Sequence, residues 1–227
     1  MESIPISKFA DLGFCELKIV YHFLEARKPS FSTHVYLGGK QHAVSAYEDS
    51  LKPRTSVSLD ELLEALKDSE SIIEFPSESV HVKFESRGFI FRGRIDKLIK
   101  SGRTATVIDE KFTNRGSSIF ADKYTTQLYA YCNGLANGKT IVSGIELGER
   151  VFAGLLLTGK VIERDIESRA LLRESCHLEF HESKFTPLVE RFTKIMKGDF
   201  DRKELACRKP EKCALCEYRN QCEYRAI

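Results

Sequence analysis

The sequence predicts a mixed α/β or α+β fold in which a mixed central sheet is flanked by helices. Helical spacing of apolar residues in the N-terminal part gives way to strict alternation at Val80, Val82 and Phe84. Helical spacing returns at residue 119 and is followed by further extended chain. The 227 residues contain no internal repeat and no low-complexity segment, so one mixed domain accounts for the pattern.

Helices are expected before the first strand. Apolar residues at helical spacing predict a first helix over Ser7–Ala26, with Cys15 inside it. A second helix is expected over 43–49, with His42 at its start. A third begins at Ser58, which opens a capping box ahead of an amphipathic run of leucines.

The rest of the chain is expected to alternate between extended and helical segments. The extended segments, in order, are residues 80–84, 89–96, 104–111, 151–157 and 161–164. The helical segments are residues 119–135 and 170–196. This order favours antiparallel strands, one helix, a hairpin and a helical C-terminal region.

Composition excludes some classes of protein and suggests one kind of site. Hydrophobic residues make up 42% and charged residues 30%, which is typical of a folded chain. No apolar run approaches the roughly 18 residues that span a bilayer, and no secretory signal is visible, so a cytoplasmic protein without membrane partners is expected. The net charge of +2 is too small to indicate a nucleic-acid or membrane partner by itself. Seven cysteines in such a chain indicate metal ligation, because cytosolic thiols stay reduced.

An acidic and lysine group follows the predicted strands. Asp96 ends one extended segment, and Asp109-Glu110-Lys111 ends the next. Asp109 and Lys111 are two residues apart in a strand, so they point to the same face, while Glu110 can offer only its main-chain carbonyl there. Phosphodiester hydrolysis needs a divalent cation on oxygen ligands and a lysine beside it, so these residue types are the expected ones. An isolated D-x-K is nevertheless more often an ordinary solvated pair.

Two further features accompany this group. The imidazole of His42 can complete a mixed nitrogen and oxygen site for manganese or magnesium. Gln127 and Tyr131 are four residues apart and share one helical face. Basic residues such as Arg94 and Lys123 bracket the predicted site and would suit a DNA backbone.

Four motifs in this order resemble the RecB-type branch of the PD-(D/E)xK nucleases. They are Gly38-x3-His42, Gly93-x2-Asp96, Asp109-Glu110-Lys111 and Gln127-x3-Tyr131. The resemblance implies a restriction-endonuclease-like core, with a Mg or Mn ion held by His42, Asp96, Asp109 and the Glu110 carbonyl. It also implies that Lys111 assists the nucleophile, and that Gln127 and Tyr131 steady the site and contact DNA.

The C-terminal part carries a second constellation, a C-x2-C-x5-C run formed by Cys213, Cys216 and Cys222. Such short spacing lets thiolates share one metal centre, which needs a fourth ligand. Spacing alone leaves two candidates, Cys15 and Cys207. Cys132 and Cys176 lie in predicted helices and are expected to be buried core residues.

The layout of cysteines resembles that of CRISPR-associated RecB-like exonucleases, which carry one cysteine before the nuclease motifs and three after them. The resemblance implies an iron-sulfur cluster, of the 4Fe-4S rather than the 2Fe-2S type, on Cys15, Cys213, Cys216 and Cys222. It also implies an exonuclease of single-stranded DNA ends that trims DNA for CRISPR spacer acquisition beside integrase proteins. Those proteins usually have Cys-Pro-Arg where this chain has Cys15-Glu16-Leu17.

The expected organisation is a nuclease core over 37–200, with an iron-sulfur subdomain formed by residues 1–36 and 201–227. Two other functions remain open at this point. One is a stand-alone or virus-encoded RecB-like nuclease of repair or recombination. The other is a non-catalytic DNA-binding protein whose C-terminal cysteines and Cys207 form a zinc knot.

Overall fold

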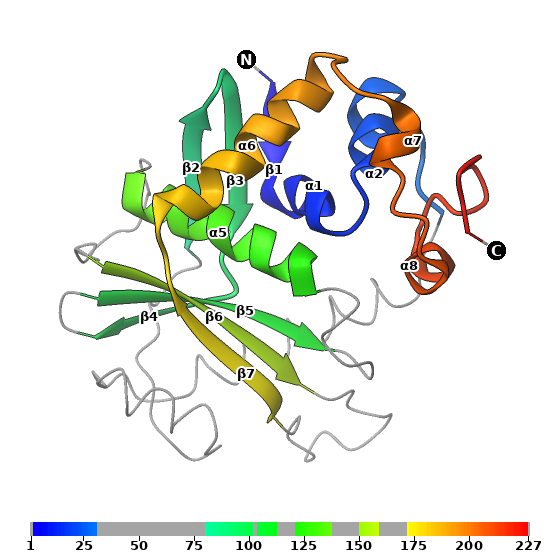
Figure 1. The fold of residues 1–227 in the computed structure, drawn as a ribbon. Coiled ribbons are helices and arrows are strands. Elements are labelled where there is room, and N and C mark those ends of the chain that lie inside the picture. Colours follow the sequence, from blue (N-terminus) through cyan, green and yellow to red (C-terminus); the bar gives the residue numbers. More distant parts are fainter. Residues whose placement is uncertain are drawn as a thin grey trace.

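Figure 1 shows the computed structural model, which describes residues 2–30, 80–101, 104–112, 121–137, 150–158 and 172–226. The predicted helices at 43–49 and from Ser58 lie outside these ranges, as do His42 and the predicted strand 161–164. Among the described helices, none has both the length and the apolar character needed to cross a membrane.

The described elements alternate between short helical turns, strands and two long helices. The N-terminal elements are β1 (Ser3–Pro5), α1 (Ile6–Phe9), η1 (Ala10–Gly13), α2 (Leu17–Ile19) and η2 (Val20–Leu24). The central elements are β2 (His81–Ser86), β3 (Phe89–Arg94), β4 (Lys97–Ser101), β5 (Thr104–Phe112), α5 (Ala121–Asn137) and β6 (Arg150–Thr158). The C-terminal elements are β7 (Leu172–Glu179), α6 (Glu182–Met196), α7 (Arg202–Leu205) and α8 (Pro210–Leu215).

The strands form two sheets. The three-stranded sheet has the order β1-β3-β2, and the four-stranded sheet has the order β4-β5-β6-β7. β5 and β6 are parallel, whereas β4 and β7 pair antiparallel to their neighbours. Parallel neighbours need a crossover, and α5 lies in the connection between β5 and β6. α5 also contacts β2 of the other sheet and α6, so the helix lies where the two sheets meet (Figure 1).

Much of the predicted order is confirmed. β2, β3, β5, β6 and α5 correspond to the predicted segments 80–84, 89–96, 104–111, 151–157 and 119–135. The mixed α/β class, with helices on a mixed sheet, is therefore confirmed as well.

Three strands depart from the predicted elements. Residues 172–179 form a strand, so only Glu182–Met196 of the predicted helix 170–196 is helical, and Cys176 lies in a strand. β7 pairs along β6, and hydrogen bonds of this non-local kind override local spacing. A strand, β1, precedes the first helix because the buried Ile4 belongs to a parallel ladder with β3. β4 was not predicted and forms a hairpin with β5.

The predicted N-terminal helix is divided into short turns. It is interrupted at Phe14–Glu16, and Cys15 lies in this break rather than inside a helix. The packing is close just before this break, because a Cβ atom on Gly13 would lie 2.2 Å from the main-chain oxygen of Asp122 at the start of α5. Only glycine therefore fits at this position.

An aromatic core holds α6 against the three-stranded sheet. Phe185 and Phe192 on α6 are buried, as are Phe84 and Phe91 on β2 and β3. The ring centroids of Phe84 and Phe185 are 5.6 Å apart, and those of Phe91 and Phe192 are 6.0 Å apart. Phe9 of α1 packs 5.1 Å from Phe91. Such pairs contribute about 0.5–1.5 kcal/mol beyond their buried area, so this core fixes the strand that leads to Asp96.

Candidate active site and cysteine cavity

Asp109 and Lys111 lie side by side on β5. Asp109 is 1% exposed, and its Oδ1 atom lies 2.7 Å from the ammonium nitrogen of Lys111. Alternation along the strand brings both side chains to one face, as the sequence predicts. The ammonium also lies 5.4 Å from the ring centroid of Tyr124 on α5, so helix and strand both position the lysine.

The second carboxylate oxygen of Asp109 has no hydrogen-bond partner among the described residues, although it is buried. Burial raises the pKa of Asp109 to about 7; Lys111 opposes this shift and Asp96 adds to it. One oxygen of this buried carboxylate has no hydrogen-bond partner among the described residues, and a second acid lies beside it. A bound cation would offset the energetic cost of holding two negative charges close together. The donor set is the oxygen set that Mg and Mn prefer, so these residues fit a divalent metal.

Asp96 reaches this site because the chain changes sheets there. It is exposed and lies between the end of β3 and the start of β4. β4 pairs antiparallel to β5 with Lys97 opposite Ile108, which places Asp96 level with Asp109. The unpredicted strand β4 therefore explains how two acids thirteen positions apart come together.

Gln127 and Tyr131 form the helical side of the site. Both are buried, and the Gln127 side-chain amide donates to the Tyr131 hydroxyl at 3.3 Å. Burial raises the pKa of Tyr131, and the charges of Asp109 and Asp96 raise it further, so the phenol keeps its proton at neutral pH. A Cβ atom on Gly93 would lie 2.8 Å from a ring carbon of Tyr131, so glycine lets the ring approach β3.

The predicted metal ligands are not all described. His42 lies outside the described residues, and Glu110, whose main-chain carbonyl is the predicted ligand, lies in β5 between Asp109 and Lys111. Within the described ranges no group of three His, Cys, Asp or Glu residues is arranged to hold a metal ion. Asp96 and Asp109 alone supply two carboxylates, so a complete site needs ligands from elsewhere.

Sequence reasoning gave Tyr124 no part in holding Lys111. Tyr124 precedes Gln127 by three residues and Tyr131 by seven, which is the spacing of one helical face. Burial raises its pKa to about 12, and its ring lies under the Lys111 ammonium. That shared face is the signal that could have assigned it to the site.

Five cysteines line one small cavity between the N-terminal turns and the C-terminal segment. They are Cys15, Cys207, Cys213, Cys216 and Cys222. All are free thiols, and both fourth-ligand candidates that spacing left open lie here. The other described cysteines are elsewhere, Cys132 buried in α5 and Cys176 in β7.

The thiols interact with one another. A hydrogen bond from Cys15 lowers the pKa of Cys207 to about 5, with smaller contributions from Cys213 and the charge of Lys212. The same bond raises the pKa of Cys15. Burial raises the pKa of Cys216 to about 11. The cavity thus concentrates sulfur donors beside a cationic side chain, which is the donor chemistry that thiolate-bound metals need.

A model of the PD-(D/E)XK nuclease superfamily matches residues 21–223, a range that contains the whole acid and lysine site. The chain belongs to the PD-(D/E)XK nuclease superfamily. Membership implies a DNA substrate and a divalent metal such as Mg or Mn.

Solved structures resemble this nuclease at low sequence identity. The structure titled "Crystal structure of SSO0001" aligns over 100% of this chain and 89% of that one, with 13% identity and a TM-score of 0.53. An alkaline exonuclease from Laribacter hongkongensis aligns over 86% of this chain and 87% of that one, with 11% identity and a TM-score of 0.42. The likeness to SSO0001 shows a shared fold, and no curated protein matches the chain.

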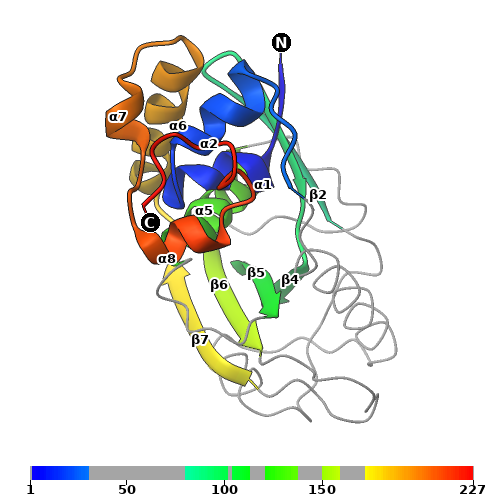
Figure 2. The same ribbon diagram turned by 90° about the vertical axis from the view of Figure 1, so that its right-hand side faces the viewer.

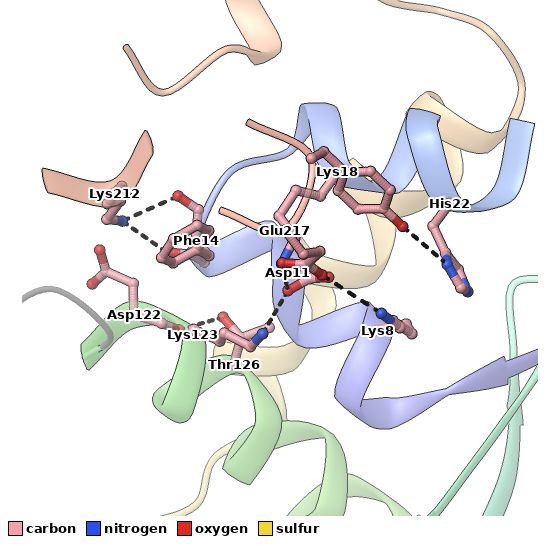
Figure 3. Close-up of polar contacts among 12 residues, drawn as sticks. Lys8, Asp11, Phe14, Lys18, His22, Asp122, Lys123, Thr126, Lys212 and Glu217 are labelled. Carbon is pink, nitrogen blue, oxygen red and sulfur yellow. Dashed lines mark hydrogen bonds and ion pairs between the residues drawn. The ribbon is translucent and has the colours of Figure 1, made fainter. Parts of the chain in front are cut away.

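A buried ionic cluster joins the nuclease helix α5 to the cysteine segment (Figure 3). Asp11 of η1 is 2% exposed, and its Oδ1 atom lies 2.7 Å from the ammonium of Lys18 and 2.6 Å from that of Lys123. Lys18 also lies 2.9 Å from Glu217, which follows Cys216 in the chain. Lys123 precedes Tyr124, so the cluster connects the two candidate sites.

Asp11 and Lys18 stabilise each other's charge in the cluster, whereas burial lowers the pKa of Lys123. Burial raises the pKa of Asp11, but Lys123 and Lys18 together hold it below its ordinary value. Burial lowers the pKa of Lys18, but Asp11 and Glu217 raise it above its usual range. Lys123, one of the basic residues expected to suit a DNA backbone, is instead paired with the buried Asp11.

Direct bonds also fasten the two ends of the nuclease together. The Lys212 ammonium donates to the main-chain oxygens of Gly13 and Phe14, each at 3.2 Å. Figure 2 shows α8 and the segment after it beside α1 and α2. Glu16, which departs from the resembled Cys-Pro-Arg motif, accepts a bifurcated hydrogen bond at 3.0 Å from the single N–H of Arg191 Nε on α6 and another at 2.7 Å from its Nη2.

Proposed function

We propose that this nuclease is a metal-dependent exonuclease that acts on single-stranded DNA ends in the cytoplasm. Asp109 carries the proposal, because a buried carboxylate with an unpartnered oxygen lies against Lys111 and next to Asp96. Mg or Mn would be held by Asp96 and Asp109, with His42 and the Glu110 carbonyl as the remaining ligands. When bound, such an ion polarises the scissile phosphate and lowers the pKa of a water molecule.

The protein's own residues supply the other steps. Lys111 is held by Asp109 and Tyr124, and it orients the attacking water and offsets negative charge that develops on the phosphate. The protonated Tyr131 hydroxyl, fixed by Gln127, donates to a phosphate oxygen and positions the strand. Burial of Asp109 excludes competing water from its carboxylate.

The order of the four motifs and the cysteine layout support a role in CRISPR spacer acquisition. In this proposal the nuclease trims DNA and hands it to integrase proteins. Its core is residues 37–200, and residues 1–36 and 201–227 form the cysteine subdomain. A repair or virus-encoded nuclease of the same branch is the competing role, which neighbouring genes would distinguish.

Digestion of end-labelled DNA tests the activity. We expect Mg or Mn to support stepwise shortening of a linear single-stranded oligonucleotide, and EDTA to stop it. Circular single-stranded DNA should stay intact, because an exonuclease needs an end, and a blunt duplex of the same sequence should be shortened more slowly. Gel electrophoresis of the labelled products measures all of these.

A Lys111→Gln variant purified in parallel is the control for contaminating nucleases, since its cleavage should be greatly reduced. Cleavage of the circle at the rate of the linear strand would overturn the exonuclease assignment. No cleavage of any DNA with either metal would overturn the proposed activity as a whole.

We further propose that the cysteine cavity holds a 4Fe-4S cluster on Cys15, Cys213, Cys216 and Cys222. Sulfur donors are the chemical type that such a group needs, and binding would draw the thiols together, because no three of these described cysteines are already arranged to hold a metal. The amide of Ala226 already donates to the Cys213 sulfur at 3.4 Å, which is the kind of bond that tunes iron-sulfur sites. The cluster would act as a staple between the two ends of the chain rather than in the chemistry.

Metal analysis of protein purified without air tests the cluster. We expect about four iron and four acid-labile sulfide per chain, as a 4Fe-4S cluster requires. Cys213→Ser and Cys15→Ser should lose the iron, because each removes a thiolate ligand. Cys132→Ala, which changes a buried thiol outside the cavity, should keep it.

The same measurement separates the alternatives. Zinc in place of iron would overturn the cluster and favour a zinc knot. Iron lost in Cys207→Ser but kept in Cys15→Ser would overturn the assigned ligand set, because both thiols lie in the cavity.

A further inference from the structure

The outer face of the β2–β3 hairpin is basic. Val82, Phe84 and Phe91 point into the core, so alternation turns the residues between them outward. Lys83 and Arg92 are exposed and stand directly opposite each other across the two strands. We call Lys83, Arg92 and the next outward residue of β3, Arg94, the basic hairpin face.

Arg94 extends this face and is also exposed. It pairs in register with His81, which is exposed as well. Glu85 is the acidic residue on the same side of β2, and it stands opposite Ile90 rather than a cation. Like charges directly opposite each other on two strands lower stability. The positive charges gathered on this hairpin therefore repel one another and destabilise it.

The cations of this face remain available to a ligand. Within the part of the chain that the structure describes, Lys83, Arg92 and Arg94 form no ion pair with a carboxylate. Arg87 at the turn of the same hairpin differs, because its guanidinium lies 2.7 Å from Glu190 of α6. Among the described residues, one hairpin thus carries an ion-paired arginine at its turn and a row of cations without ion-pair partners toward its other end.

That row leads to the acids. Arg94 lies two residues before Asp96, and its charge acts on Tyr131, whose ring packs under Gly93. Extended chain rises about 3.3 Å per residue, so Arg92 to Asp96 spans about 13 Å.

We propose that the basic hairpin face holds the phosphate backbone of a DNA strand next to Asp96 and Asp109. This inference rests on the proposed nuclease activity and adds the path of the substrate. The contacts would be to phosphates and independent of sequence, because they come from point charges on a sheet face rather than from a base-reading element. The strand would run along β3 and cross onto the four-stranded sheet at Asp96.

Binding measured against salt tests this path. The variant is Lys83→Gln/Arg92→Gln/Arg94→Gln, and the matched control is Arg87→Gln on the same hairpin. The probe is a fluorescein-labelled oligothymidylate in EDTA, which prevents cleavage, and fluorescence anisotropy gives Kd from 0.05 to 0.5 M NaCl. Urea unfolding of each variant shows that the hairpin is intact.

Each phosphate contact to a single strand contributes about 0.7 to the slope of log K against log salt, so the triple variant should lose about 2. If the affinities of the two proteins converge near 1 M salt, the triple variant should bind DNA on the order of 10²-fold more weakly than the wild type at about 0.1 M. Arg87→Gln should keep the wild-type slope, because its charge is already paired with Glu190.

Two results would overturn the proposed path while leaving the activity in place. One is an unchanged slope in the triple variant of a wild-type protein that digests DNA. The other is an equal loss in Arg87→Gln, which would mean that any charge on the hairpin matters. Wild-type protein that neither binds nor digests DNA would instead refute the proposed function, and the path with it.

Discussion

Asp109→Asn should reduce DNA cleavage by on the order of 10³-fold, because a metal contributes several kcal/mol to the transition state and each 1.36 kcal/mol is tenfold in rate. The substitution removes the buried charge and leaves Lys111 without its 2.7 Å partner. The measurement is the initial rate on end-labelled linear single strands in Mg and in Mn. The control is Asp199→Asn, an exposed carboxylate beyond the end of α6.

Stability should not fall in the same variant. The pKa of Asp109 in the folded protein, about 7, lies above its ordinary value of 3.8, chiefly because the group is buried. Ionised Asp109 therefore opposes folding at neutral pH when no metal is bound, and asparagine removes that cost. Urea unfolding in EDTA measures this. An inactive variant that is also much less stable would mean that Asp109 is a structural residue, and a variant with a tenth or more of wild-type activity would exclude it from catalysis.

Asp11→Asn should lower the free energy of unfolding by about 3–5 kcal/mol, the usual cost of removing one partner of a buried ion pair. The substitution leaves Lys123 without its 2.6 Å counterion and leaves Lys18 with Glu217 alone. Urea denaturation at pH 7 with an unchanged m-value is the measurement. Because the pKa of Asp11 is held below 3.8, its contribution is present at neutral pH and lost as the pH falls below that value.

Two companion variants test whether the loss of stability comes from leaving a buried charge without its partner. Glu16→Gln breaks a pair with Arg191 that is partly exposed, so it should cost about 1 kcal/mol or less. Asp11→Leu combined with Lys123→Met should recover most of the loss, since apolar groups of similar size replace buried pairs well. A cost under about 1 kcal/mol for Asp11→Asn itself would contradict a stabilising cluster.

Local periodicity predicts those parts of the site that lie within one element. Asp109 and Lys111 are two residues apart on a strand, and the structure brings them to 2.7 Å. Gln127 and Tyr131 are four apart on a helix, and their side chains are hydrogen-bonded. In both cases the geometry of one strand or one helix is sufficient, so no knowledge of the tertiary fold is needed.

Local periodicity cannot predict contacts between segments that are far apart in the sequence. Asp11 and Lys123 are 112 positions apart, and nothing in the residues near either one indicates the other. Local spacing predicts a helix where β7 lies, because the hydrogen bonds that make this segment a strand come from the distant β6. Spacing could not choose between Cys15 and Cys207, and the fold places both in one cavity because the chain ends meet there.

The meeting of the two chain ends also sets an order of events during synthesis. Cys15 and Asp11 emerge from the ribosome about 200 residues before Cys222. At about 5–20 residues per second, this interval is about 10–40 s. Throughout it the N-terminal turns lack the contacts that α8 and the last cysteines provide, whereas Lys123 becomes available to Asp11 about halfway through. The nuclease helix can therefore engage the N-terminal turns before the cysteine cavity closes, because closure needs the later segment that carries Cys207 to Cys222.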